Sequence, residues 1–236
     1  MLGAIASDII GSVHEFAATK SMDFDQFVPA SRFTDDTVLA VAVADCLLHG
    51  LDYVDTFHKY AAAYPGVGWG LRFNGWITSG RRDPYNSYGN GSAMRVPAVA
   101  YAFDAMDDVL AEAARSAAVT HNHPEGIKGA QATAAAIFMA RQGETKRRIK
   151  SSVEQVFGYR LSDRLDDLRP TYEFDESCQR TVPAALIAFL ESQNYEDAVR
   201  KAISLGGDAD TLACITGAVA EAHYGGVPSE IARAAK

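Results

Sequence analysis

A helical spacing of apolar residues runs through almost the whole chain and limits what it can fold into. Apolar side chains recur about every three to four residues in segments that begin at Leu2, Asp35, Asp52, Asp108, Gly126, Thr181 and Ala209. The alternation of Val, Ile and Thr between hairpin turns that indicates a sheet is absent. We therefore predict an all-α protein.

Small residues predict how these helices pack. Segments 129–140 (GAQATAAAIFMA) and 209–222 (ADTLACITGAVAEA) are rich in Ala and Gly, which let helix axes approach closely. No Pro- or Ser-rich linker divides the chain, and 48% of its residues are hydrophobic. We expect one compact helical bundle over residues 1–236, with loops at 66–70, 79–92 and 121–126 and an exposed helix within 144–170.

Composition excludes several classes of protein. The chain has 22 Lys and Arg against 30 Asp and Glu, a net charge of −8 that disfavours the nucleic-acid backbone as a partner. The longest apolar run, Val38 to Leu48, contains Asp45 and is shorter than the roughly 20 residues of a membrane span. The first ten residues have no cationic flank and include Asp8, unlike a secretory signal, so we expect a cytoplasmic protein. The three cysteines show no CxxC spacing and predict buried thiols.

Two helix starts carry more acidic residues than helix capping requires. Thr34, Asp35 and Asp36 begin one small, apolar helix, and a second one begins with Asp208, Asp210 and Thr211. A cap needs one acceptor side chain and contributes roughly 0.5–2 kcal/mol, yet each start offers two carboxylates with adjacent hydroxyls. Because residues two apart on a regular helix point in nearly opposite directions, Asp208 and Asp210 can converge only if the chain enters the helix irregularly. The preceding Gly206–Gly207 pair makes such an entry possible.

If the two starts face each other, four carboxylates share one space. Two such charges about 4 Å apart repel by about 4 kcal/mol at an effective dielectric constant near 20. Either some carboxylates are protonated, or divalent cations lie between them. A ligand set of carboxylate and hydroxyl oxygens, without Cys or His, favours Mg²⁺ or Mn²⁺ over zinc.

Five motifs, in this order, make the chain resemble the ADP-ribosylglycohydrolase family: GAIASDIIGSVHEF, FTDDTVLA, NSYGNGSAMRVP, THNHPEGIKGA and GGDADTLACITGA. The resemblance implies an all-helical fold around two divalent cations, Mg²⁺ or Mn²⁺, that hold the distal ribose of ADP-ribose. It places the metal ligands at Thr34, Asp35, Asp36, Asp208, Asp210 and Thr211. In the first motif Ser7 stands where the family has glycine before Asp8, which indicates slightly different packing.

The resemblance also implies the substrate contacts and the catalytic residues. The glycine-rich loop and the following histidine would bind ADP-ribose through Ser87, Tyr88, Gly89, Asn90, Gly91, Ser92 and His121. Glu15 matches a family glutamate over the substrate and is expected to transfer a proton or to gate the metal site. Asp35 is expected to activate water in addition to its role as a ligand.

The implied reaction is hydrolysis of the N- or O-glycosidic bond between ADP-ribose and an acceptor, which reverses ADP-ribosylation. The substrate would be an ADP-ribosylated protein or a small ADP-ribose conjugate, with nucleic acid only as a modified substrate, and we expect a monomer. One alternative is a non-catalytic ADP-ribose-binding protein that shares the fold. A second is a Mg²⁺-dependent isoprenoid-diphosphate enzyme, but its DDxxD motif is missing because Val38 and Leu39 follow the acidic pair.

Overall fold

The protein is a helical bundle in a computed structural model that describes residues 1–236. Its helices are α1 (Leu2–Gly11), α2 (Asp35–His49), α3 (Tyr53–Ala63), α4 (Leu71–Thr78), α5 (Gly91–Met94), α6 (Val99–Ala102), α7 (Met106–Ala118), α8 (Pro124–Arg141), α9 (Lys146–Phe157), α10 (Leu165–Leu168), the 3-10 turn η1 (Arg169–Thr171), α11 (Cys178–Glu191), α12 (Tyr195–Ile203), α13 (Ala209–Tyr224) and α14 (Ser229–Ala234). The only β-type pairing is an isolated bridge between Gly89 and Ser177. The prediction of an all-α fold is confirmed.

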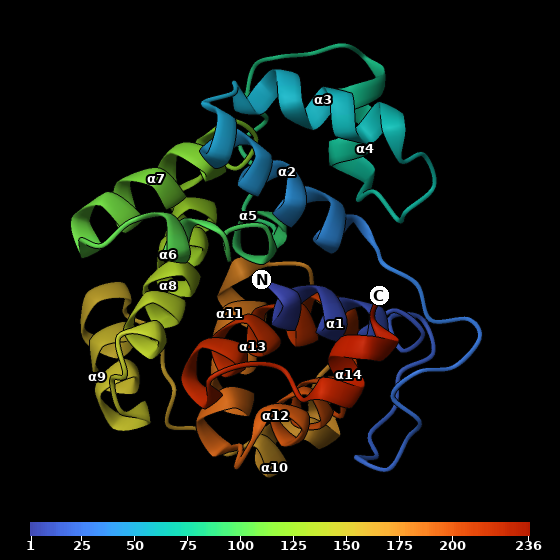
Figure 1. The fold of residues 1–236 in the computed structure, drawn as a ribbon, viewed down its shortest axis with the longest axis vertical. Coiled ribbons are helices and arrows are strands. Elements are labelled where there is room, and N and C mark those ends of the chain that lie inside the picture. The colour runs from blue at the N-terminus through green and yellow to red at the C-terminus, as the bar shows by residue number, and fades with distance from the viewer.

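Helix α13 forms the centre of the core and lies beside α1 (Figure 1). The two helices approach closely because small residues face each other along the contact. A Cβ atom on Gly217 would lie 2.0 Å from Ser7 Oγ and 2.5 Å from the Gly3 carbonyl oxygen. The Ser7 hydroxyl is buried and hydrogen-bonds Tyr195 Oη at 2.8 Å, so the protein accommodates serine at this position by pairing its side chain.

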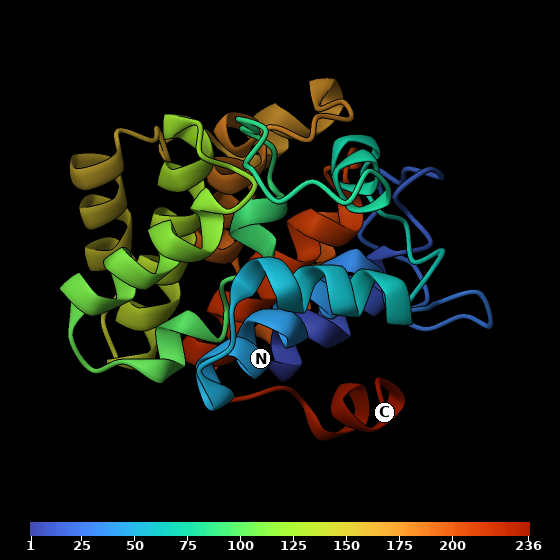
Figure 2. The same cartoon turned by 90° about the horizontal axis from the view of Figure 1, so that it is seen from above.

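The remaining helices surround this centre. Helices α3 and α4 lie at one end of the molecule with α2 between them and α1 (Figure 1). Helix α9 lies on the side opposite the long loop 12–34, as the view from above also shows (Figure 2). Helix α8 is buried along most of its length and contacts α7, α9, α11 and α13. The acidic starts of α2 and α13 are therefore placed by the most deeply packed part of the fold.

Helix boundaries differ from the sequence prediction where capping residues decide them. Segment 121–126 was expected to be a loop, but α8 begins at Pro124 because His123 Nδ1 accepts a hydrogen bond from the Glu125 N–H. The polar segment after residue 144 contains α9, whose exposed charged face matches the prediction. The sequence pattern did not predict α4 or α12, which are 8 and 9 residues long and offer too few turns for a clear apolar period.

Two expectations from composition concern the interior and the membrane. All three cysteines are unpaired and buried, as predicted. None of the helices combines the length and the apolar character that crossing a bilayer would require.

Candidate active site

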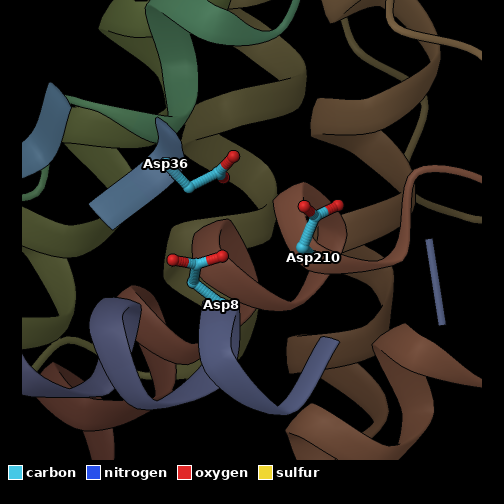
Figure 3. Close-up of side chains that lie close together, drawn as sticks. All are labelled: Asp8, Asp36 and Asp210. Atoms are coloured by element: carbon cyan, nitrogen blue, oxygen red, sulfur yellow. The ribbon is translucent and has the colours of Figure 1, made fainter. Parts of the chain in front are cut away.

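The two acidic helix starts meet at the centre of the molecule. Carboxylate oxygens of Asp36 in α2 and Asp210 in α13 lie within 4.8 Å of each other and of Asp8 in α1. The three side chains come from three different helices and point into a common space (Figure 3). All three residues are buried. The sequence predicted the meeting of Asp36 with Asp210 but no metal role for Asp8.

Thr34 and Asp8 hold the start of α2 in place. The Thr34 hydroxyl caps the helix by accepting a hydrogen bond from the Asp36 N–H at 3.2 Å, and it donates to Asp8 Oδ1 at 2.6 Å. Asp8 Oδ2 in turn accepts from the Thr34 N–H at 2.9 Å. The Thr34 hydroxyl also lies 3.5 Å from Asp36 Oδ2, so it stands between two carboxylates of the cluster, and its role as a metal ligand stays a prediction.

An irregular chain entry brings Asp208 and Asp210 to the same side. Gly206 and Gly207 both have φ of +71°, a conformation that other residues rarely adopt. Asp208 follows as the N-cap of α13 with ψ of 75° and makes no capping hydrogen bond through its side chain. Oxygens of Asp208, Asp210 and Glu15 then form a second cluster within 4.8 Å. The geometry agrees with the expectation that the glycine pair permits this convergence.

Hydrogen bonds connect the two starts to each other and to the glycine-rich loop. Thr211 Oγ1 donates to Asp36 Oδ2 at 3.1 Å, across 175 positions in sequence. Asn90 Nδ2 donates to Asp208 Oδ2 at 2.6 Å and also to Thr181 Oγ1 at 3.0 Å. One loop residue, Asn90, thus orients a carboxylate of the acidic cluster.

A single cavity of about 270 Å³ contains most of the predicted site residues. Its volume is close to the lower end of the range for small-molecule sites, roughly 300 to 1,000 Å³. Its carboxylates are Glu15, Asp35, Asp36, Glu176, Asp208 and Asp210, and the cationic side chains that line it are Arg72 and Arg95. Asp35 is half-buried and belongs to neither three-residue cluster. Carboxylates therefore outnumber the cationic side chains that line the cavity, which makes it strongly acidic.

Burial and mutual repulsion raise the pKa values of these carboxylates. Burial, followed by the charges of neighbouring aspartates, raises the pKa of Asp35, Asp36 and Asp210 well above the ordinary value. Burial is also the main cause that raises the pKa of Glu15 to about 7, and the charge of Asp208 adds to it. No salt bridge joins a lysine, arginine or histidine to any of these groups to offset the cost.

The donor set fits divalent cations of the hard type. Asp36 Oδ1 is buried and has no hydrogen-bond partner, which is costly for a carboxylate oxygen unless a cation binds it. The surrounding ligand atoms are all oxygens, from carboxylates and the Thr211 hydroxyl, as Mg²⁺ and Mn²⁺ prefer. The residues that would hold such cations are Asp8, Asp36, Asp208, Asp210 and Thr211, and the predicted ligands Thr34 and Asp35 lie beside them.

The glycine-rich loop lies beside the acidic cluster, to which Asn90 is hydrogen-bonded, and only part of the predicted set of substrate contacts lines the cavity. Ser87, Gly89, Asn90, Gly91 and His121 line it. The loop is held by hydrogen bonds from the Asn90 N–H to the Glu176 carbonyl at 2.6 Å and from the Cys178 N–H to the Tyr88 carbonyl at 2.9 Å.

Two of the predicted substrate contacts are placed elsewhere. The Ser92 side chain is fully buried and donates to the Gly126 carbonyl at 2.7 Å, because its position in α5 turns it toward α8. Tyr88 is 48% exposed, packs edge-on against the His123 ring and lines a shallow groove next to the cavity. Direct contact with a ligand in the deep cavity is thus open to the other five residues and not to the Ser92 side chain.

Sequence reasoning gave no site role to three residues that line the cavity, Arg72, Tyr85 and Glu176. Arg72 at the start of α4 donates to the Tyr85 carbonyl and stacks on the Tyr85 ring, with its guanidinium carbon 5.1 Å from the centroid. Glu176 lies beside Asp208, whose charge adds to burial in raising the Glu176 pKa. Only tertiary structure brings these three residues to the cavity, since none belongs to a motif or to an apolar period.

Loop 12–34 carries Glu15 to the edge of the acidic cluster. Lys20 Nζ fastens this loop to the Tyr172 carbonyl at 2.7 Å and to the Leu205 carbonyl. Arg200 Nη1 fastens it again through the Met22 and Phe24 carbonyls, at 3.0 and 2.9 Å. Glu15 therefore extends from a loop that is anchored on the C-terminal side of this residue.

Comparison with known proteins agrees with this geometry. The sequence profile of the ADP-ribosylglycohydrolase family matches residues 1–235. "ADP-ribosylhydrolase ARH3" of Homo sapiens is 28% identical over 307 residues, which cover 95% of this chain and 84% of that protein. "ADP-ribosylarginine hydrolase Tri1" of Pseudomonas putida (strain GB-1) is 27% identical over 271 residues, with coverage of 98% and 71%.

A solved structure shares the fold. The "ADP-ribosylglycohydrolase-related protein complex" superposes with a TM-score of 0.71 and 24% sequence identity, over 99% of this chain and 94% of that chain. The family profile extends over both acidic helix starts, the glycine-rich loop and Glu15. The chain therefore belongs to the ADP-ribosylglycohydrolase family, a family of glycohydrolase enzymes.

Proposed function

We propose that the protein hydrolyses the glycosidic bond between ADP-ribose and an acceptor, with two divalent cations, Mg²⁺ or Mn²⁺, bound in the acidic cluster. The observation that carries this proposal is the convergence of Asp8, Asp36 and Asp210, with an unpartnered oxygen on Asp36. Asp36 and Asp210 of this cluster line the same cavity as the glycine-rich loop. The relatives named for action on ADP-ribosyl groups support the choice of substrate. The acceptor is a side chain of a modified protein or a small ADP-ribose conjugate.

The charges of the cavity orient the substrate. The pyrophosphate of ADP-ribose is repelled by the carboxylates and is attracted to Arg72, while His121 and the backbone N–H of Gly91 offer neutral donors nearby. The distal ribose then lies over the acidic cluster, whose cations would orient its hydroxyls and lower the pKa of a coordinated water. Asn90 holds Asp208 in position through their 2.6 Å hydrogen bond.

Two carboxylates, Asp35 and Glu15, transfer the protons of the hydrolysis. Asp35 accepts a proton from the attacking water as the water oxygen bonds to C1 of the ribose. The bond from C1 to the acceptor breaks, and the acceptor leaves with its electron pair and a proton from Glu15. The environment of Glu15 raises its pKa to about 7, so this residue is partly protonated near neutral pH and suits the role of a general acid.

The test is turnover of defined substrates. Peptides ADP-ribosylated on arginine or on serine, together with small ADP-ribose conjugates, would be incubated with the protein in MgCl₂, in MnCl₂ or in EDTA. Mass spectrometry should detect free ADP-ribose and unmodified acceptor with at least one substrate, and only when a divalent cation is present.

Two alternatives give different results in this test. A non-catalytic ADP-ribose-binding protein would bind the conjugates without consuming them. An isoprenoid-diphosphate enzyme would consume an allylic diphosphate and leave the conjugates intact, although the family match over residues 1–235 argues against it. Turnover that persists in EDTA after dialysis would contradict the role of the cations.

A further inference from the structure

Arg95 lines the cavity and is connected to His121 through the side chain of Thr120. Its side chain is fully buried at 0% exposure, and its guanidinium carbon lies 4.8 Å from the centroid of the Phe57 ring. Nη2 donates to the Ser116 carbonyl at 2.7 Å and to Thr120 Oγ1 at 3.0 Å. No carboxylate forms a salt bridge with this guanidinium, so its position depends on neutral acceptors.

The hydroxyl of Thr120 joins Arg95 to His121. It lies 2.7 Å from His121 Nδ1, and Thr120 is itself fully buried. A guanidinium only donates, so the Thr120 oxygen accepts from Arg95 and keeps its own proton for another partner. His121 Nδ1, at 2.7 Å, is the acceptor within hydrogen-bond distance of that proton, whereas the Tyr85 hydroxyl, which also interacts with the Thr120 side chain, carries a proton of its own to donate to the threonine oxygen. A buried hydroxyl proton without an acceptor costs roughly 1–3 kcal/mol.

The direction of this hydrogen bond decides where the imidazole proton lies. If Nδ1 accepts from Thr120, a neutral His121 carries its proton on Nε2. Nε2 faces the glycine-rich loop, since Cβ atoms built on Gly89 and Gly91 would lie 3.5 and 3.3 Å from it. Burial, reinforced by the charges of Arg95 and Arg72, lowers the pKa of His121 well below the ordinary value and keeps the ring neutral.

We propose that Arg95 and Thr120 are positioning residues that hold His121 as the Nε2–H tautomer, so that the cavity presents one fixed N–H donor beside Gly89 and Gly91. The partner of that donor is an oxygen acceptor on the ligand. That this acceptor belongs to ADP-ribose rests on the proposed function, whereas the tautomer does not.

The free protein tests the tautomer directly. Long-range ¹H–¹⁵N NMR spectra of protein labelled with ¹⁵N-histidine show which imidazole nitrogen carries the proton, and loss of one signal set in His121→Gln assigns it among the six histidines. Wild type and Thr120→Ser should show His121 with the proton on Nε2. Thr120→Val should lose this preference and give signals from both tautomers, because Nδ1 no longer has a donor. A proton on Nδ1 in the wild type, or an unchanged spectrum in Thr120→Val, overturns the proposal.

Two variants control for general effects on the core. Thr133 is also fully buried, but its hydroxyl has no hydrogen-bond partner, so Thr133→Val should leave the His121 signals unchanged. The Tyr85 ring lies 6.0 Å from the His121 ring, and its hydroxyl is the other group that interacts with the Thr120 side chain. Under the proposal this hydroxyl donates to Thr120 and does not take the threonine proton. Tyr85→Phe should therefore also keep the proton on Nε2, and a change of tautomer in this variant would identify Tyr85 as the controlling residue instead.

Binding separates this proposal from the proposed function. Calorimetry with ADP-ribose should give a Kd about tenfold higher for Thr120→Val than for wild type, as expected for one misdirected hydrogen bond in a buried site, and Thr120→Ser should restore it. If the NMR result holds and ADP-ribose does not bind to the wild type, the positioning role stands and the proposed function fails. If ADP-ribose binds equally well to Thr120→Val, the role of the fixed donor in binding is wrong.

Discussion

Gly11 in α1 lies so close to Asp210 in α13 that a Cβ atom on Gly11 would be 2.5 Å from the Asp210 Cα. The same Cβ atom would be 2.8 Å from the Ala209 carbonyl oxygen. These atoms belong to the backbone and cannot rotate away. The absence of a side chain at Gly11 therefore sets how near α1, with Asp8, approaches the first turn of α13.

Gly11→Ala should force these two helices apart at the acidic cluster. Overpacking of a rigid contact costs about 1–3 kcal/mol, and we expect the free energy of unfolding to fall by this amount and the affinity for Mn²⁺ to fall at least tenfold. Chemical denaturation and Mn²⁺ titration by calorimetry measure the two effects. Gly75→Ala in α4 is the matched control, since its Cβ would meet nothing within 4 Å. Unchanged Mn²⁺ affinity in Gly11→Ala would refute the link between this contact and the cluster.

Asp36→Asn should abolish the stabilisation of the protein by divalent cations. It should also make the cation-free protein more stable. The substitution removes one of several repelling buried charges, so the cation-free protein should gain stability on the order of 1 kcal/mol at pH 8. The rise in Tm that MgCl₂ or MnCl₂ causes in the wild type should disappear, together with turnover. The exposed Asp107 of α7 provides the control Asp107→Asn, which should respond to cations as the wild type does. A wild-type response in Asp36→Asn would exclude Asp36 as a ligand.

Stability of the cation-free protein should fall as pH rises. Unfolded carboxyl groups titrate near pH 4, whereas burial raises the pKa of Asp36 and Asp210 well above that and the pKa of Glu15 to about 7. Between about pH 4 and 7 the folded state thus binds more protons than the unfolded state, so unfolding becomes easier with each step up in pH. In EDTA, this loss should be larger for the wild type than for Asp36→Asn. Added MnCl₂ should raise Tm more at pH 8 than at pH 5, since cations bind the deprotonated form. A larger cation effect at pH 5 would contradict this account.

Glu15→Gln should reduce turnover without loss of substrate binding. Glutamine keeps the shape of the side chain but supplies no titrating proton, and general acid or base groups contribute about 10²–10⁴-fold to rate. We expect kcat to fall by roughly this factor and the limb of the pH profile that depends on Glu15 to vanish, while the Kd for ADP-ribose changes little. Steady-state kinetics across pH and calorimetry provide the comparison. A pH profile identical to that of the wild type would rule out proton transfer by Glu15.

Arg72→Gln should weaken binding of the substrate more than it slows the chemistry. A hydrogen bond to a charged group is worth about 1.5–3 kcal/mol, so KM should rise about tenfold or more while kcat stays within about threefold. The effect should diminish at high salt, because Arg72 is exposed. Arg147, exposed on α9 far from the cavity, gives the control Arg147→Gln. A fall in kcat at unchanged KM would assign Arg72 to the transition state instead.

Two properties of the sequence explain which features could be predicted: the helical spacing of apolar residues and the surplus of carboxylates at two helix starts. The long helices have clear apolar periods, so the all-α fold could be predicted from local sequence. The two acidic starts carry more carboxylates than a cap needs, which led to the hypothesis that Asp36 and Asp210 meet, and the family resemblance implied both as metal ligands. Asp8 appeared as a polar residue in an apolar helix, and only the packing of α1 on α13 shows that it faces Asp36. Arg72 lies in the short helix α4 and Glu176 in the irregular segment before α11, and the position of both depends on contacts between distant segments. The roles of the individual site residues remain predictions.

The hydrogen bond between Asn90 and Asp208 joins two parts of the cavity that would bind different things. Asn90 belongs to the glycine-rich loop, and Asp208 is one of the carboxylates of the acidic cluster. Whatever alters the charge or direction of the Asp208 carboxylate also alters the partner that holds the loop residue in place. Under the proposed function, cation affinity and nucleotide affinity would be linked through this single amide, and each would change the other by the same factor.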